Sequence, residues 1–202
     1  VVTSESGGVK VESNVADILA GKEDDSSGGV VAVKYDENLD LCGIVMGSGV
    51  AFLLNLGKGG ASSPNAVDGR WLRSSKAVSI DIEPTRMLAT VGLSDGDVEQ
   101  FYIGVPAGDS CPVIRTLSLS GWYFEPADVG GAKVVSWSPD RSALVVGWEK
   151  RGLAVWSVSG CRLMWTLPQV GGTLPTTPAL RRDARMMKLA HPMEQGVAAS
   201  AW

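Results

Sequence analysis

The pattern Gly92-Leu93-Ser94-Asp95-Gly96 is the feature of this sequence that comes closest to an enzyme signature. Its GxSxG spacing matches the nucleophile elbow of serine hydrolases, in which a helix follows the serine and a histidine activates it. The residues from Val98 to Ile103 favour a strand instead, and His191 is the only histidine of the chain. The sequence therefore favours a tight turn between two strands, with Ser94 as a hydrolase nucleophile kept as the enzyme alternative.

A second candidate for chemistry is Gly57-Lys58-Gly59-Gly60-Ala61-Ser62-Ser63, which resembles a phosphate-binding loop. Such a loop needs its lysine directly before a serine or threonine and a helix after it. Lys58 is not adjacent to Ser62, and Pro64 follows the run. We therefore expect a surface loop at 57–63.

Metal binding and redox chemistry are not indicated by the residues that usually support them. Cys42, Cys111 and Cys161 lie far apart without a CxxC pair, which favours three small buried hydrophobic residues in a reducing compartment. The acidic run Glu23-Asp24-Asp25 lacks the spaced oxygen ligands of a calcium loop, and His191 lies in loop-like sequence. We therefore expect no catalytic residue, no cofactor and no metal ligand.

The charge of the chain limits the partners that it can bind. A net charge of −4 and a pI near 5.0 argue against a nucleic-acid partner, because phosphate neutralisation needs a basic surface. The local basic group Arg181, Arg182, Arg185 and Lys188 could contact anionic lipid or an acidic protein surface, although a basic surface loop is the simpler interpretation.

Residues 133–167 show the clearest structural pattern. Apolar or alternating runs at 133–137, 143–148, 153–158 and 163–167 are separated by turn-forming residues at 138–142, 149–152 and 159–161. Pro139 presets the first corner of a type I turn, and Leu163, Trp165 and Leu167 alternate with polar or exposed positions as in a half-exposed strand. The pattern predicts a four-stranded antiparallel meander, with Trp137, Trp148 and Trp156 in its core.

The same plan recurs along the chain. The interval from Pro84 to Pro139 is identical to the interval from Gly92 to Gly147. Strand-like runs surround these positions at 77–82, 87–91 and 98–103, and a fainter copy covers 30–35, 41–46 and 50–54. Ala199-Ser200-Ala201-Trp202 resembles Val134-Val135-Ser136-Trp137 as the start of another unit. A four-strand unit that recurs every ~50 residues is typical of β-propeller blades.

The uncharged stretch 41–57 could be mistaken for a membrane span. A spanning helix needs ~20 apolar residues, whereas Gly47-Ser48-Gly49 divides this stretch into two short runs. We expect a buried β-hairpin here.

These observations predict an all-β chain of WD-like propeller blades. We expect a flexible lead-in at 1–29, about three blades at 30–167, an inter-strand loop at 168–197 with a short helix near 179–190, and the start of a further blade at 198–202. Three units are fewer than the 4–8 blades of typical propellers, so we expect a partial propeller with an open arc and exposed blade faces.

The amino-acid sequence of the clearest unit resembles that of one family. Trp137-Ser138-Pro139-Asp140, Val145 to Glu149, Gly152 to Val158 and Gly160 to Leu163 are similar to the Ric-one family, and 67–103 resembles the preceding blade of that family. The Ric-one protein is the WD-repeat subunit of a two-subunit exchange factor for the Golgi Rab GTPase of the Rab-six type.

The chain departs from standard WD repeats. These repeats carry Gly-His and Trp-Asp pairs that form a Trp–Ser/Thr–His–Asp hydrogen-bond network, whereas Trp156 is followed here by Ser157. That network cannot form with a single histidine, as in the similarly degenerate blades of the Ric-one family.

The resemblance implies a scaffold role in nucleotide exchange without covalent catalysis. Expected partners are an Rgp-type subunit and a Golgi Rab GTPase, in the cytoplasm and at the periphery of Golgi membranes, during retrograde endosome-to-Golgi transport. The family's carboxy-terminal helical region is absent from these residues, so exchange activity is expected only as part of a complex. A WD-like scaffold of another trafficking or signalling complex is the alternative.

Overall fold

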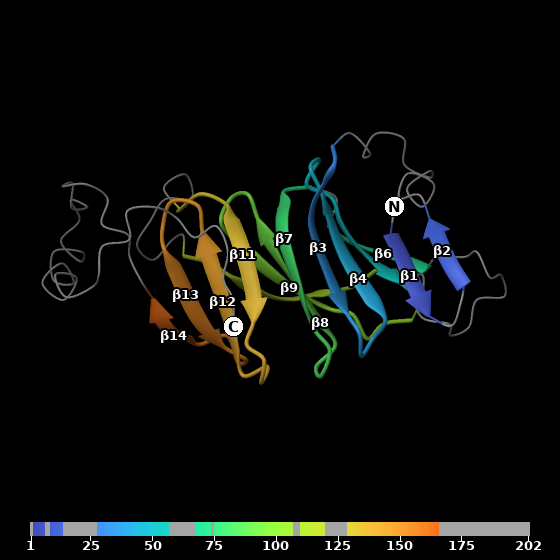
Figure 1. Cartoon of the computed structure of the whole chain (residues 1–202). Helices are drawn as coiled ribbons and strands as arrows, with labels where there is room; N and C mark the ends of the chain where they lie inside the picture. Colours follow the sequence, from blue (N-terminus) through green and yellow to red (C-terminus); the bar gives the residue numbers. More distant parts are fainter. Residues whose placement is uncertain are drawn as a thin grey trace, which may run out of the picture.

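The described structure is built entirely from antiparallel β-sheets. The computed structural model describes residues 2–6, 9–13, 28–56, 68–73, 75–106, 110–119 and 129–165. Within these residues, three four-stranded sheets and one two-stranded sheet are formed (Figure 1). The small sheet pairs β1 (Val2–Ser6) with β2 (Val9–Ser13).

Each large sheet is a meander in which consecutive strands are neighbours. The first sheet contains β3 (Val30–Asp36), β4 (Leu41–Met46), β5 (Ala51–Asn55) and β6 (Asp68–Arg73). The second contains β7 (Ala77–Glu83), β8 (Leu88–Leu93), β9 (Val98–Tyr102) and β10 (Val113–Leu117). The third contains β11 (Ala132–Trp137), β12 (Ala143–Trp148), β13 (Leu153–Ser157) and β14 (Arg162–Trp165).

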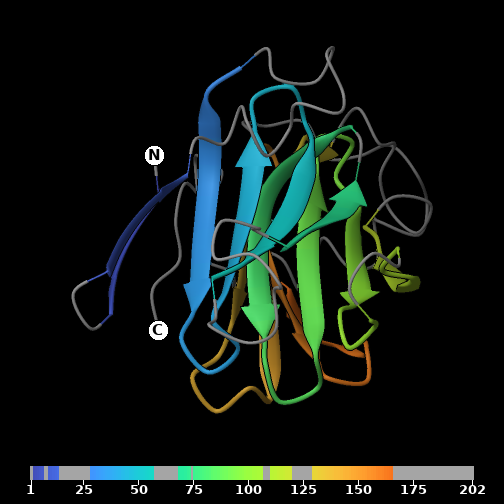
Figure 2. The same ribbon diagram turned by 90° about the vertical axis from the view of Figure 1, so that its right-hand side faces the viewer.

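The three large sheets stack side by side in chain order and form an arc (Figure 1). The first strand of each sheet is its inner strand, and β7 packs against both β3 and β11. Figure 2 shows the arc from the side of the first sheet. In this sheet the order of the strands is β3, β4, β5 and β6, from the inner edge of the arc outward. Four-stranded meanders stacked in this way are propeller blades, so the chain forms a partial β-propeller. The expected meander over 133–167 is confirmed up to Trp165.

One irregularity recurs at the same place in all three large sheets. The pairing of the inner strand with the second strand shifts by one residue after Val30, Ala77 and Ala132, which leaves Val31, Val78 and Lys133 as bulge residues. Val78 and Lys133 are separated by the same interval as Pro84 and Pro139. Because a bulge fixes the register of a sheet, the repeat extends to individual positions.

Two buried hydrophobic clusters lie between the sheets, and a third, which includes Ile44 and Phe52, is formed by the first sheet alone. One cluster joins the first and second sheets through Val45, Leu53, Ile80, Ile82 and Phe101, which are at most 6% exposed. A second cluster joins the second and third sheets and contains the tryptophans expected in the core, Trp137, Trp148 and Trp156. β8, in the middle sheet, faces a sheet on both sides and reads as an apolar run that is buried throughout.

Three features differ from the sequence-based expectations or refine them. The expected lead-in at 1–29 includes the paired strands β1 and β2, which the sequence analysis did not predict. The fourth strands β6 and β10 were not predicted from the sequence; neither DGRWLR nor VIRTL shows the regular alternation of a half-exposed strand. Residues 41–46 and 51–55 form the expected hairpin, and no described helix is long and apolar enough to cross a membrane.

Candidate interaction surface

Ser94 lies in the turn between β8 and β9, so the GxSxG pattern belongs to a β-hairpin. The turn is closed by the amide of Gly96 donating to the carbonyl of Leu93 at 3.1 Å, and Gly96 has a φ of 96°. A strand follows Ser94 instead of the helix that a nucleophile elbow needs, and the described residues include no histidine to activate it. The turn interpretation is confirmed.

The three cysteines have different environments. Cys42 and Cys111 are buried, and burial raises the pKa of both thiols. Cys161 is exposed in the turn before β14, so the expectation that all three are buried was wrong for this residue. Among the described residues, no group of three metal-ligating side chains comes together.

Several residues considered for chemistry lie outside the described residues. These are the glycine-rich run at 57–63 with Lys58, the acidic run at 23–25, the basic group at 181–188, His191, the loop at 168–197 and the blade start at 198–202.

The tryptophan of the degenerate WD position has an unpaired indole. Trp156 lies on β13, is 7% exposed, and its Nε1 atom is buried without a hydrogen-bond partner in the described part of the chain. Leu144 of β12 stands directly opposite and offers no hydroxyl group. An unsatisfied buried donor costs about 1–3 kcal/mol. The third sheet therefore lacks the hydrogen-bond network that stabilises a standard WD blade.

Hydrogen bonds between the second and third sheets take the place of that network. The indole N–H of Trp137 donates to Thr90 Oγ1 at 3.1 Å, and its backbone amide donates to Asp81 Oδ2 at 2.7 Å. The hydroxyl of Ser79 donates to the carbonyl of Ala132 at 2.6 Å. The indole of Trp148 donates to the carbonyl of Gly96 at 2.7 Å. We call these four contacts the inter-sheet clasp; all of them are buried.

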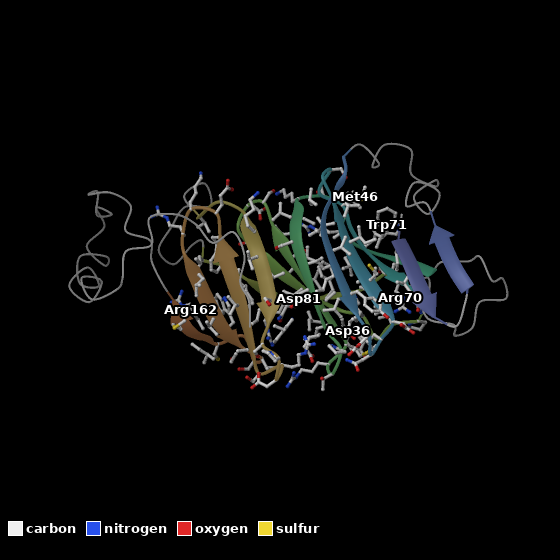
Figure 3. All side chains as sticks on the ribbon, viewed as in Figure 1. Asp36, Met46, Arg70, Trp71, Asp81 and Arg162 are labelled. Atoms are coloured by element: carbon white, nitrogen blue, oxygen red, sulfur yellow. The ribbon has the colours of Figure 1, made fainter. Side chains whose placement is uncertain are left out.

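Asp81 connects all three sheets from the middle of the arc (Figure 3). Besides the amide of Trp137, its carboxylate accepts the amide of Ile82 at 2.8 Å and pairs with Lys34 Nζ of the first sheet at 3.2 Å. The Asp81 side chain is 2% exposed, so water cannot replace these partners. Because a buried carboxylate is tolerated only when its charge is compensated, Lys34 and the two amides form one electrostatic unit with it.

Arginine side chains on the outer strands also link neighbouring sheets, through hydrogen bonds to backbone carbonyls. Arg70 of β6 donates to the carbonyls of Ile103 at 2.9 Å and Val105 at 2.8 Å, in the segment that follows β9. Arg115 of β10 donates to the carbonyl of Val158, which follows β13, at 2.7 Å. Ile103 and Val158 occupy equivalent positions of the repeat, so the same backbone carbonyl of the unit accepts an arginine at both interfaces.

The turn after each inner strand is held by a buried polar side chain at the strand's end. Asp36 Oδ1 accepts the amides of Asn38 and Leu39. Glu83 accepts the amides of Thr85 and Arg86, and Ser138 Oγ accepts the amide of Ala143. In the third of these turns, hydrogen bonds from Ser138 and Ser142 lower the pKa of Asp140 to about 2.

Large apolar side chains are exposed at two places that form the candidate interaction surface. On β3, Val31, Val33 and Tyr35 are 59%, 57% and 50% exposed, and we call this row the β3 strip. The outer strands expose Val113 and Ile114 on β10 and Leu163 and Met164 on β14, between 47% and 63%. Rows of exposed apolar side chains at a sheet edge or face are the candidate contact surface among the described residues.

Comparisons with known proteins give a local similarity and a fold similarity. No family model matches the chain. A stretch of 38 residues, 19% of the chain, is 53% identical to the guanine nucleotide exchange factor subunit RIC1 of Mus musculus and 50% identical to that of Homo sapiens. The match spans only 3% of the length of these curated relatives.

Two solved structures are similar over more of the chain, at 12% identity and a TM-score of 0.49 each. One is described as a eukaryotic initiation factor and matches 71% of this chain and 33% of its own. The other is the β-propeller domain of Cps50 (Swd1) from Myceliophteria thermophila and matches 81% of this chain and 47% of its own. The propeller assignment itself follows from the sheet topology, and the chain is a partial β-propeller with short similarity to an exchange-factor subunit.

Proposed function

We propose that this chain is part of the propeller scaffold of a guanine nucleotide exchange factor complex that acts on a Golgi Rab GTPase. The observation that carries the proposal is the 38-residue match to subunits named RIC1, at about half identity. Support also comes from the described residues, whose polar side chains are used in contacts between sheets and in turns.

Nucleotide exchange suits a scaffold because it requires no covalent chemistry. An exchange factor works by binding the nucleotide-free GTPase more tightly than the nucleotide-bound form, so that GDP leaves and GTP enters. This differential affinity needs a wide contact surface in place of a catalytic group. The exposed rows on β3, β10 and β14 are surfaces that a partner subunit of the Rgp type or the GTPase could cover.

The proposed setting is the cytoplasmic face of Golgi membranes, in retrograde transport from endosomes. A net charge of −4 makes the chain as a whole a poor ligand for anionic lipid, so membrane association would depend on partners.

Release of a fluorescent GDP analogue from the Rab GTPase tests this proposal. We expect the full parent protein with its partner subunit to accelerate release, and residues 1–202 alone to leave the rate unchanged. A paired variant, Ile114→Asp with Leu163→Asp, should weaken the response if the outer strands contribute contacts, whereas the exposed control Thr116→Asp should not. An unchanged release rate with parent and partner together would reject the exchange-factor role and leave a scaffold of another assembly.

A further inference from the structure

The hydroxyl group of Ser94 makes no contact that holds the fold together. Ser94 is exposed in the turn between β8 and β9, and its backbone amide donates to the carbonyl of Lys76 at 2.8 Å. In the described part of the chain its side chain has no hydrogen-bond partner. Ser138 and Ser142, in the turn between β11 and β12, instead donate to Asp140. The Ser94 hydroxyl group is therefore open to a modifying enzyme.

Acidic residues follow Ser94 at short intervals. Asp95 is the next residue and Asp97 is the third after it, and both side chains are partly exposed. None of the other serines and threonines of the sequence has an aspartate or glutamate three residues later. A kinase with a basic substrate groove selects such an acidic segment by charge complementarity. Ser94 therefore has the surroundings of a substrate serine for a kinase of this class.

Lysines from two sheets lie beside Ser94. Lys76 precedes β7 of the second sheet, and its carbonyl accepts the amide of Ser94. Lys133 is the bulge residue of β11 in the third sheet. A Cβ atom on Gly131 would lie 3.4 Å from Ser94 Cα and 3.6 Å from Lys133 Cε. Ser94 is therefore adjacent to a lysine of its own sheet and to a lysine of the next sheet.

Both lysines have only weak partners in the described structure. Lys76 Nζ pairs with Asp95 at 3.0 Å, and Lys133 Nζ pairs with Glu149 at 4.0 Å. The two lysine side chains are 54% and 45% exposed, so water screens both ion pairs. A phosphate group carries more negative charge than a carboxylate at pH 7 and has three acceptor oxygens. A phosphate on Ser94 therefore competes with both carboxylates for the ammonium groups.

We propose that Ser94 is a phosphorylation site for an acidophilic serine kinase. The kinase transfers the γ-phosphoryl group of ATP to Ser94 Oγ. The new O–P bond replaces the bond to the bridging oxygen, ADP leaves, and the hydroxyl proton passes to the general base of the kinase. The phosphate then pairs with Lys76 and Lys133 and links the second sheet to the third. It reinforces the inter-sheet clasp, because the indole of Trp148 already joins the third sheet to this turn through the carbonyl of Gly96.

Incorporation of radiolabelled phosphate tests the modification itself. The folded chain is incubated with γ-labelled ATP and with casein kinase 2 as the acidophilic probe. We expect Ser94→Ala to abolish incorporation and Asp97→Asn to lower its rate about tenfold, because the kinase groove loses a charge partner. The control Glu37→Gln removes an exposed carboxylate that does not follow Ser94 and should leave the rate unchanged. No incorporation, or incorporation that survives Ser94→Ala, would overturn the proposal.

Urea unfolding of the phosphorylated chain tests the link between the sheets. We expect the midpoint to rise after phosphorylation and to return when alkaline phosphatase removes the phosphate. Lys133→Met should remove most of this rise. Salt at about 1 M should also reduce it, because salt screens the interactions of exposed charges. A midpoint that stays the same or falls, or a rise that Lys133→Met leaves intact, would show that the phosphate does not join the two sheets.

Discussion

The two interfaces between the large sheets use the same ladder positions with different chemistry. Lys34 stands opposite Gly43 in the first sheet, and Asp81 stands opposite Thr90 at the equivalent place in the second. At Gly43 a Cβ atom would lie 2.8 Å from Ile80 Cδ1, so the isoleucines of β7 pack directly on the backbone of β4. At Thr90 the side chain accepts a hydrogen bond from the indole of Trp137.

The difference shows how one repeat produces a mainly apolar and a mainly polar packing at its centre. Glycine allows close approach, so the centre of the first interface depends on shape and burial, together with the ion pair of Lys34 with Asp81 and the contacts of Arg70 at its outer end. Aspartate and threonine provide acceptors, and the second interface then depends on directional hydrogen bonds made by Trp137. The third sheet has Ser136 opposite Val145 at these positions, so its open side repeats neither arrangement.

The largest effect is expected at Asp81, the residue that both interfaces share. Asp81→Ala leaves Lys34 and the amides of Ile82 and Trp137 without their acceptor. The expected loss of unfolding free energy is about 2–5 kcal/mol, because two buried amides lose their acceptor at about 1–3 kcal/mol each, whereas the Lys34 side chain is 45% exposed and is solvated by water. Urea unfolding measures it. The control Asp95→Ala removes an exposed ion pair with Lys76 and should cost less than about 1 kcal/mol; equal losses would contradict the central role of Asp81.

A pair of glycine variants compares the two interfaces directly. A Cβ atom at Gly92 would collide with the carbonyl oxygen of Ala132, a backbone atom of the third sheet, and with Ser79 Oγ. Gly92→Ala should therefore cost about 1–3 kcal/mol through overpacking. Gly43→Ala meets only the flexible end of Ile80 and should cost clearly less in the same urea series. A larger loss at Gly43 would mean that the first interface is the more rigid one.

Trp148 and Trp156 allow a comparison between an indole N–H that donates a hydrogen bond and a buried indole N–H that does not. Trp148→Phe removes the hydrogen bond to the carbonyl of Gly96, whereas Trp156→Phe removes an N–H group that has no partner in the described part of the chain. Similar volume is lost in both variants, so the difference reports the hydrogen bond. We expect Trp148→Phe to be the more destabilising by about 1–3 kcal/mol in thermal or urea unfolding. Equal losses would show that Trp156 has an unrecognised acceptor.

The smallest effect concerns the pH dependence of the first interface. Burial raises the pKa of Glu99 above its usual range, although Arg73 at 3.0 Å opposes this shift. A raised pKa means that the folded state binds the proton more tightly, so the stabilisation is present below the ordinary value of 4.5 and is lost as pH rises through the folded pKa. Glu99→Gln should therefore gain stability relative to the native chain between pH 4 and 7. The opposite slope in urea titrations would show that Arg73 dominates.

Local patterns in the sequence were sufficient to predict the strands and turns around Pro84 and Pro139. Proline, glycine and aspartate at those corners act within a single turn, so each turn can be predicted without knowledge of the rest of the chain. The outer strands β6 and β10 were missed because their pairing depends on β5 and β9, and a half-exposed edge strand has a weak pattern of its own.

The inter-sheet clasp could not be predicted from the sequence. Its side chains come from positions far apart in the chain, as Trp137 and Thr90 or Trp148 and Gly96 show. Which side chains meet is decided by the bulge at each inner strand and by the stacking of one sheet on the next. The absence of a standard WD network was visible in the single histidine, but its replacement by contacts between sheets needed the three-dimensional register.

A double-mutant cycle between Thr90 and Trp137 tests most directly whether hydrogen bonds between sheets stabilise the arc. The unfolding free energies of the native chain, Thr90→Val, Trp137→Phe and the double variant are compared in urea, with Leu144→Val and Trp156→Phe as the matched cycle within the third sheet. We predict a favourable coupling of about 0.5–1.5 kcal/mol for Thr90 and Trp137, in the range of a buried hydrogen bond. The matched cycle should show only a packing coupling, smaller than that of Thr90 and Trp137. Additive losses for Thr90 and Trp137 would contradict the inter-sheet clasp.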